Sequence, residues 1–210
     1  MYTLTKEQQQ RISPKQAIEL LKAGNRRFVS NLKINRNLLQ QVNETSQGQH
    51  PFAAVLSCMD SRTPAELIFD QGLGDIFSLR IAGNILNDDI VGSLEFACDV
   101  VGAKLIAVVG HSGCGAIQGA CNGVELGYLS QLLHKIGPVI EKTKTSCPHL
   151  QPDTPEFMQQ VTRLNIKHTA EEISSRSNIL NKLLSQQKIA IIGGLYNIDN
   201  GEVEFFDNLS

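Results

Sequence analysis

The chain has 210 residues, of which 41% are hydrophobic and 19% are charged, and its formal net charge is −2. This length and composition are typical of one globular domain with a sizeable core. A nearly neutral chain without a basic run is not of the kind that binds nucleic acid, and no stretch approaches the roughly 20 apolar residues of a membrane span.

Helix signals stand close to the amino terminus. Ser13 and Pro14 give an N-cap followed by a proline at the first helical position, and Gln16 completes a capping box. Apolar residues then recur at helical spacing, so we predict a helix over residues 14–31. The Asn- and Gln-rich residues 32–50 are typical of a loop or a partly helical connection.

Apolar, β-branched runs alternate with helical patterns along the rest of the chain. Buried strands are predicted over residues 51–58, 75–83, 103–111 and 188–198. Helices are predicted over residues 65–72, 90–102, 115–122, 125–143 and 155–185. This alternation indicates an α/β fold with a mostly parallel sheet covered by helices on both faces.

A tight-turn signal, Asp199-Asn200-Gly201, follows the fourth predicted strand. Residues 202–206 are therefore expected to pair back as an antiparallel edge strand. The expected central sheet has about four parallel strands and this one antiparallel edge.

We expect the whole chain, residues 1–210, to form a single domain. Within it, residues 1–31 are expected to form an amino-terminal arm with a protruding helix, and residues 51–206 the α/β core. The polar amino-terminal residues lack the apolar segment of a secretory signal, so a cytoplasmic location is expected.

Residues with metal-binding side chains follow two of the predicted strands. Cys58 and Asp60 come after the first strand, and His111 and Cys114 come at the end of the third. Two thiols, an imidazole and a carboxylate are a plausible zinc shell, and Arg62 can hold the carboxylate away from the metal. An arginine in that role favours a catalytic zinc. Spacing alone leaves two alternatives: a closed structural zinc site, or core thiols beside a surface ion pair.

The remaining cysteines do not suggest a disulfide framework. Five cysteines are an odd number, and no secretory signal accompanies them. Cys98 and Cys121 fall in apolar helical patterns and are expected in the core, whereas Cys147 lies in a polar loop. A thiol redox protein is disfavoured because the chain has no Cys-x-x-Cys motif.

Four sequence blocks closely resemble the signature blocks of the β-class carbonic anhydrases. They are CMDSR at 58–62, RIAGN at 80–84, GHSGCGAI at 110–117 and LYNIDNGEV at 195–203. The blocks occur in the family's order, and the resemblance covers roughly residues 13–206. It implies a zinc enzyme that interconverts carbon dioxide and bicarbonate.

The resemblance assigns roles to the metal-binding residues. Cys58, His111 and Cys114 would be permanent zinc ligands, and Asp60 would be either the fourth ligand or the partner of Arg62. With Asp60 on Arg62, a water would occupy the fourth position and zinc would lower the pKa of that water towards about 7. Zinc-bound hydroxide would then attack carbon dioxide. Because two thiolates donate more charge than histidines, we expect a less acidic water and activity that rises into the alkaline range.

Alternatives on the same fold are a hydrolase of carbon disulfide or carbonyl sulfide, and a non-catalytic zinc protein with Asp60 permanently on the metal. By alignment with the family's substrate pocket, the substrate-binding residues are expected to be Gln49, Phe77, Ala82, Phe96 and Gly115. Phe96 falls where many relatives carry a tyrosine. Family members are dimers or multiples of dimers, so a homodimer or homotetramer is expected, and helix 14–31 would pack either on its own domain or on the neighbour.

Some relatives are inhibited by bicarbonate at a second site built from a tryptophan, an arginine and a tyrosine. Arg80 and Tyr196 match that pattern, but the tryptophan position holds Val55. The resemblance therefore predicts an open metal site at neutral pH and no cooperative bicarbonate inhibition.

Overall fold

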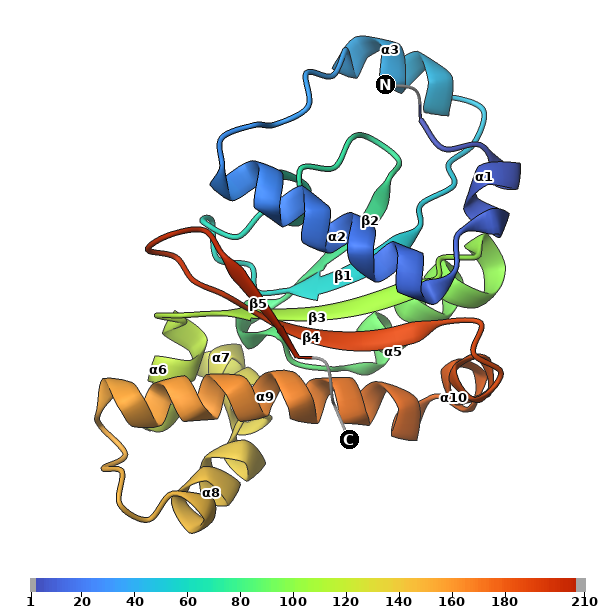
Figure 1. Cartoon of the computed structure of the whole chain (residues 1–210). Coiled ribbons are helices and arrows are strands. Elements are labelled where there is room, and N and C mark those ends of the chain that lie inside the picture. The colour runs from blue at the N-terminus through green and yellow to red at the C-terminus, as the bar shows by residue number, and fades with distance from the viewer. Residues whose placement is uncertain (1–2, 207–210) are drawn as a thin grey trace.

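A central five-stranded sheet organises residues 3–206, which are those that the computed structural model describes (Figure 1). The strands are β1 (Ala53–Ser57), β2 (Ile76–Arg80), β3 (Leu105–His111), β4 (Ala190–Tyr196) and β5 (Val203–Phe206). Their order is β2-β1-β3-β4-β5. The first four strands are parallel, and β5 pairs antiparallel to β4. The predicted α/β fold, with its antiparallel edge strand, is confirmed.

Helices cover both faces of this sheet, and some of them lie in segments for which no helix was predicted. They are α1 (Lys6–Arg11), α2 (Pro14–Val29), α3 (Leu38–Thr45), α4 (Ala65–Ile68), α5 (Asp88–Glu95), α6 (Gly115–Cys121), α7 (Gly127–His134), α8 (Gly137–Ser146), α9 (Pro155–Arg176) and α10 (Asn178–Ser185). A short 3₁₀ turn, η1 (Ala82–Asn84), follows β2, and a π-helical segment, η2 (Phe96–Val101), continues α5. Among residues 3–206, no helix is long and apolar enough to cross a membrane.

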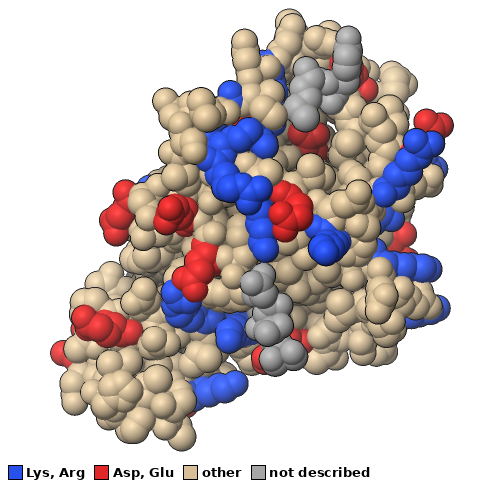
Figure 2. Space-filling view, viewed as in Figure 1, with Lys and Arg blue, Asp and Glu red and all other residues tan. Residues whose placement is uncertain are grey.

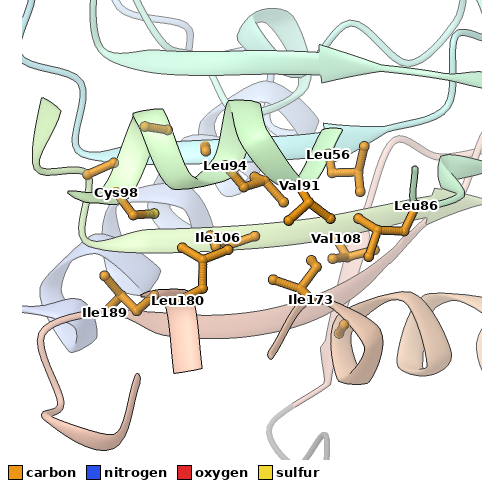
Figure 3. Packing of buried hydrophobic residues seen from close by; sticks show 14 of the residues in the cluster. Leu56, Leu86, Val91, Leu94, Cys98, Ile106, Val108, Ile173, Leu180 and Ile189 are labelled. Carbon is orange, nitrogen blue, oxygen red and sulfur yellow. The ribbon is translucent and has the colours of Figure 1, made fainter. Parts of the chain in front are cut away.

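The strands alternate their side chains between two apolar layers, as the two-residue period of a β-strand requires. Leu56, Ile106 and Val108 pack with α5, α9 and α10 on one face, where Cys98 also lies in the core as expected (Figure 3). The opposite face buries Val55 with Leu21 of α2, among others. Full burial of one such side chain contributes about 1.5–3 kcal/mol, so both layers hold the strands in register.

Helix α2 lies across the sheet rather than protruding from it (Figure 1). Its Ala17 and Leu21 are fully buried. The Asn25 amide donates to the carbonyls of Ile68 at 3.1 Å and Gly201 at 2.9 Å, which ties the helix to its own chain. The outer surface of α2 carries mixed basic and acidic side chains, as expected for the solvated side of an amphipathic helix (Figure 2). Packing on its own sheet is thus the arrangement observed.

Gly24 sets how closely α2 approaches the sheet. A Cβ at this position would lie 1.7 Å from the Phe69 carbonyl oxygen, so a larger side chain forces the helix away. We expect Gly24→Ala to lower the free energy of unfolding by about 3 kcal/mol, the upper end of ordinary overpacking costs. Urea unfolding checks this against Gly92→Ala in α5, where an added Cβ meets nothing within 4 Å. Equal stabilities of the two variants would contradict this account of the packing.

The sheet brings the carboxyl ends of β1 and β3 side by side. Ser57 at the end of β1 is in register with Val109, two residues before the end of β3. Residues that follow these strands therefore meet at one edge of the sheet, where open α/β folds usually place ligands.

Candidate metal centre

Three buried side chains converge beyond the ends of β1 and β3. Cys58 follows β1, His111 ends β3, and Cys114 immediately precedes α6. Their ligand atoms all lie within 4.8 Å of one another, and the two sulfur atoms are 3.9 Å apart. The structure therefore brings together the three residues that the sequence proposed as permanent metal ligands.

A tight turn lets β3 and α6 aim their ligands at one point. Gly113 lies between the two ligands of this turn and has φ +63°, a conformation that favours glycine. The Ser112 amide donates to the Tyr196 carbonyl at 3.0 Å, and the Ser112 hydroxyl accepts from the Ile198 amide at 3.0 Å. These contacts fix the ligand-bearing turn against the end of β4.

The hydrogen bond of His111 fixes its tautomer. Nδ1 lies 2.9 Å from the Ser112 carbonyl oxygen, which can only accept, so Nδ1 carries the ring hydrogen. In the neutral ring, Nε2 then presents an unprotonated lone pair. It is buried and has no hydrogen-bond partner within residues 3–206. A buried ring nitrogen with a free lone pair beside two sulfurs is what a metal ligand requires.

The electrostatics of the two thiols also fit a divalent cation. The hydrogen bond from the Cys114 thiol stabilises the Cys58 thiolate and lowers the pKa of Cys58. The same hydrogen bond, together with burial, raises the pKa of Cys114. A second thiolate this close to the first needs positive charge, and a metal ion supplies it. Zinc prefers such nitrogen and sulfur donors.

Asp60 is held by Arg62. Arg62 Nε donates to Asp60 Oδ1 at 2.9 Å, and Nη2 donates to Oδ2 at 2.8 Å. These hydrogen bonds hold the pKa of Asp60 well below its usual range, so the side chain is a carboxylate. Asp60 Oδ2 lies 3.9 Å from His111 Nε2, beside the three-residue cluster but outside it.

Two further residues, which the predicted site did not include, hold the loop after β1. Arg80 Nε donates to the Cys58 carbonyl at 3.2 Å, and Arg80 also hydrogen-bonds the Asp60 carbonyl. The Thr63 hydroxyl reaches the same two carbonyls, at 3.2 and 3.0 Å. The sequence could have indicated Arg80, because it is the first residue of the RIAGN block. It could not have indicated Thr63, because the contacts of Thr63 form only once the loop has folded.

Two of the predicted substrate-binding residues lie beside the cluster. Ala82 begins η1, where its neighbour Gly83 donates an amide hydrogen to Cys58 Sγ at 3.4 Å. Gly115 begins α6 directly after Cys114 and is exposed. Both residues are small and leave space beside the ligands.

The other three lie away from the cluster in the same chain. Gln49 is exposed and precedes β1, whereas the ligands follow β1, a separation of roughly 17 Å along a five-residue strand. Phe77 and Phe96 have ring centroids 6.2 Å apart and line a hollow of about 530 Å³ beside α5. One chain therefore does not bring these residues to its own metal ligands.

Comparison with known proteins gives consistent matches. Residues 53–203 match the family model described as carbonic anhydrase. The chain is 32% identical over 200 residues to "Carbonic anhydrase 2" of Mycobacterium tuberculosis, covering 94% of this chain and 95% of that protein. It is 30% identical to the carbonic anhydrase of Mycolicibacterium smegmatis, again covering 94% of this chain and 95% of that protein.

Solved structures show the same fold. The β-carbonic anhydrase CcaA superposes with a TM-score of 0.73 at 26% identity, covering 92% of this chain and 94% of that one. The β-carbonic anhydrase CafA of Aspergillus fumigatus has a TM-score of 0.74 at 24% identity, covering 80% and 81%. A structure titled as one of two tetrameric β-carbonic anhydrases from Sordaria macrospora has a TM-score of 0.71 at 23% identity, covering 78% and 84%.

Proposed function

The chain belongs to the β-class carbonic anhydrase family of carbonate dehydratases, and we propose that it hydrates carbon dioxide reversibly to bicarbonate and a proton at a zinc ion held by Cys58, His111 and Cys114. The observation that carries this proposal is the convergence of three buried donors within 4.8 Å, with His111 Nε2 left without a partner in residues 3–206. Two thiolates and a neutral imidazole balance the charge of a divalent ion. When bound, zinc acts as a Lewis acid that lowers the pKa of water at an open fourth position.

Asp60 and Arg62 control access to that fourth position. Arg62 holds both carboxylate oxygens of Asp60, and a carboxylate committed in this way does not close the metal shell. A carboxylate can only accept hydrogen bonds. Asp60 would therefore accept a hydrogen bond from the attacking hydroxyl group, which would turn a lone pair of its oxygen toward carbon dioxide.

The remaining substrate wall comes from a second copy of the chain in this proposal. Ala82 and Gly115 lie at the cluster, but Gln49, Phe77 and Phe96 lie elsewhere in the same chain. A homodimer or homotetramer can bring those three residues to a neighbour's metal, and the Sordaria macrospora structure is titled as tetrameric. The cytoplasmic location expected from the sequence stays a prediction.

Stopped-flow hydration of carbon dioxide with a pH indicator tests the proposed activity. Zinc-loaded protein is expected to accelerate hydration, whereas protein stripped by a chelator is expected to show the buffer rate and to recover when zinc is restored. Carbonyl sulfide and carbon disulfide serve as comparison substrates. Faster turnover of either than of carbon dioxide, or no turnover by zinc-loaded protein, would contradict the proposal.

Bicarbonate is expected not to inhibit the enzyme cooperatively. Val55 occupies the position of the large indole in inhibited relatives, and it is fully buried in the core layer under α2. Arg80 is engaged by the carbonyls of Cys58 and Asp60. The initial rate of the enzyme, measured at neutral pH as a function of bicarbonate concentration, is expected to follow a simple hyperbolic curve without a sigmoidal region. A sigmoidal loss of activity would show that another side chain completes the second site.

A further inference from the structure

One metal ligand receives a hydrogen bond from an unusual turn. The Gly83 amide donates to Cys58 Sγ at 3.4 Å, and both residues are buried. A hydrogen bond to a thiolate fixes the direction of the sulfur and withdraws part of its charge, so it affects how strongly the sulfur binds a metal. The position of the Gly83 amide therefore matters to the proposed metal site.

The turn that carries this amide needs support from outside. Gly83 has φ +67° and Asn84 has φ +42°, so two successive residues are left-handed. A Cβ on Gly83 would lie 3.1 Å from Ile136 Cδ1 and 3.3 Å from Ala116 Cβ, so the space around it is tight. Such backbone conformations persist where the surrounding structure determines them.

Asn165 of α9 provides that support. Its side-chain amide donates to the Gly83 carbonyl at 2.8 Å, and Asn165 is only 2% exposed. Its neighbour Ile166 is fully buried against Gly110, which precedes a metal ligand, so α9 is fixed relative to β3. A continuous set of contacts thus runs from α9 through Gly83 to Cys58.

We propose that Asn165 is a positioning residue for the metal centre: through the Gly83 carbonyl it holds the Gly83 amide on Cys58 Sγ. This inference rests on the proposed metal site. It adds to that site a residue that lies 107 positions after Cys58 in the sequence. Loss of comparable outer contacts typically lowers metal affinity 10- to 100-fold. Loss of the Asn165 amide is expected to have an effect in this range.

The test compares Asn165→Ala with Asn25→Ala. Asn25 is a matched control because it is also buried and donates its amide to two carbonyls, but those belong to Ile68 and Gly201. Competition with a chromophoric chelator measures zinc affinity. Absorption of the cobalt-substituted protein measures the sulfur-to-metal charge-transfer band, which a merely structural role would not shift. Unfolding of the metal-free proteins measures general stability.

Asn165→Ala is expected to bind zinc at least about 10-fold more weakly than wild type and to shift the cobalt band. Asn25→Ala is expected to lose stability but to keep wild-type affinity and spectrum. If the alanine variant does not fold, Asn165→Ser, whose side chain is too short to reach the Gly83 carbonyl, carries the same expectation. Wild-type zinc affinity and an unshifted band in a folded Asn165 variant would overturn the inference. Wild-type protein that binds no metal would instead overturn the proposed function, and the inference with it.

Discussion

Replacing Cys114 with serine is expected to abolish stoichiometric zinc binding and to reduce carbon dioxide hydration to the uncatalysed rate. Cys114 supplies one of three buried donors, and its sulfur lies 3.9 Å from that of Cys58. A serine hydroxyl does not ionise near neutral pH, so it can replace neither the charge nor the affinity of a thiolate. The loss of turnover should be on the order of 10⁶-fold if the enzyme reaches the lower end of usual enzymatic accelerations.

Cys98→Ser is the matched control for this experiment. Cys98 is equally buried, but it belongs to η2 and faces the core layer, and burial raises the pKa of its thiol to about 12. Cys98→Ser is expected to keep one zinc per chain and full turnover even if it unfolds more easily. Zinc content by elemental analysis and stopped-flow rates decide the comparison. Full zinc and full turnover in Cys114→Ser would remove Cys114 from the site.

Arg62→Ala is expected to reduce turnover about 10²- to 10⁴-fold while zinc remains bound, a range typical of losing one positioned catalytic side chain. Arg62 holds Asp60 through two side-chain hydrogen bonds of 2.9 and 2.8 Å. Without it, the carboxylate is free to move onto the metal and fill the open position. Asp60→Ala is expected to be impaired for a different reason, because the hydrogen-bond acceptor for the attacking oxygen is missing.

The double variant separates these two effects. If Asp60 closes the site in Arg62→Ala, removing Asp60 as well reopens it, so the two losses should not add. Arg163→Ala is the control, because Arg163 pairs with Glu204 through a similar two-point contact that includes none of the metal ligands. It is expected to keep wild-type turnover. Full turnover by zinc-bound Asp60→Ala would contradict the role given to this pair.

The parallel strands with their antiparallel edge and the metal ligands could be anticipated from the sequence because local signals carry them. Each ligand follows a buried apolar run, and parallel pairing brings strand ends to one edge of the sheet. The Asn87 cap before α5 and the turn at Asn200 are also local, since each depends on residues within a few positions. Contacts of this kind leave a readable pattern in one sequence.

Other features depend on contacts between distant segments. Asn165 meets Gly83 across 82 positions, and nothing in the pattern of α9 marks that asparagine as different from others. The predicted helix over residues 155–185 divides at Ser177, whose side chain caps α10 by accepting from the Leu180 amide at 3.0 Å. A serine inside an apolar helical pattern gives only a weak signal for such a break.

The surface on which α2 packs could also not be predicted from local sequence signals. Its amphipathic pattern fits its own sheet and a neighbouring chain equally well. The choice is made by Gly24, which contacts the Phe69 carbonyl, and by Asn25, which bonds to loops far along the chain. The short helix α1 was missed although the capping box of Thr5 and Gln8 was available, because a six-residue helix carries little apolar periodicity.

X-ray absorption at the zinc edge of the purified, folded protein measures the metal shell itself. We expect one zinc per chain, with two sulfur neighbours at about 2.3 Å and the remaining neighbours, nitrogen or oxygen, at about 2.0–2.1 Å. These would be Cys58, Cys114 and His111, with one position left for solvent. A zinc shell without sulfur, or protein that retains no stoichiometric zinc, would show that Cys58 and Cys114 are not metal ligands.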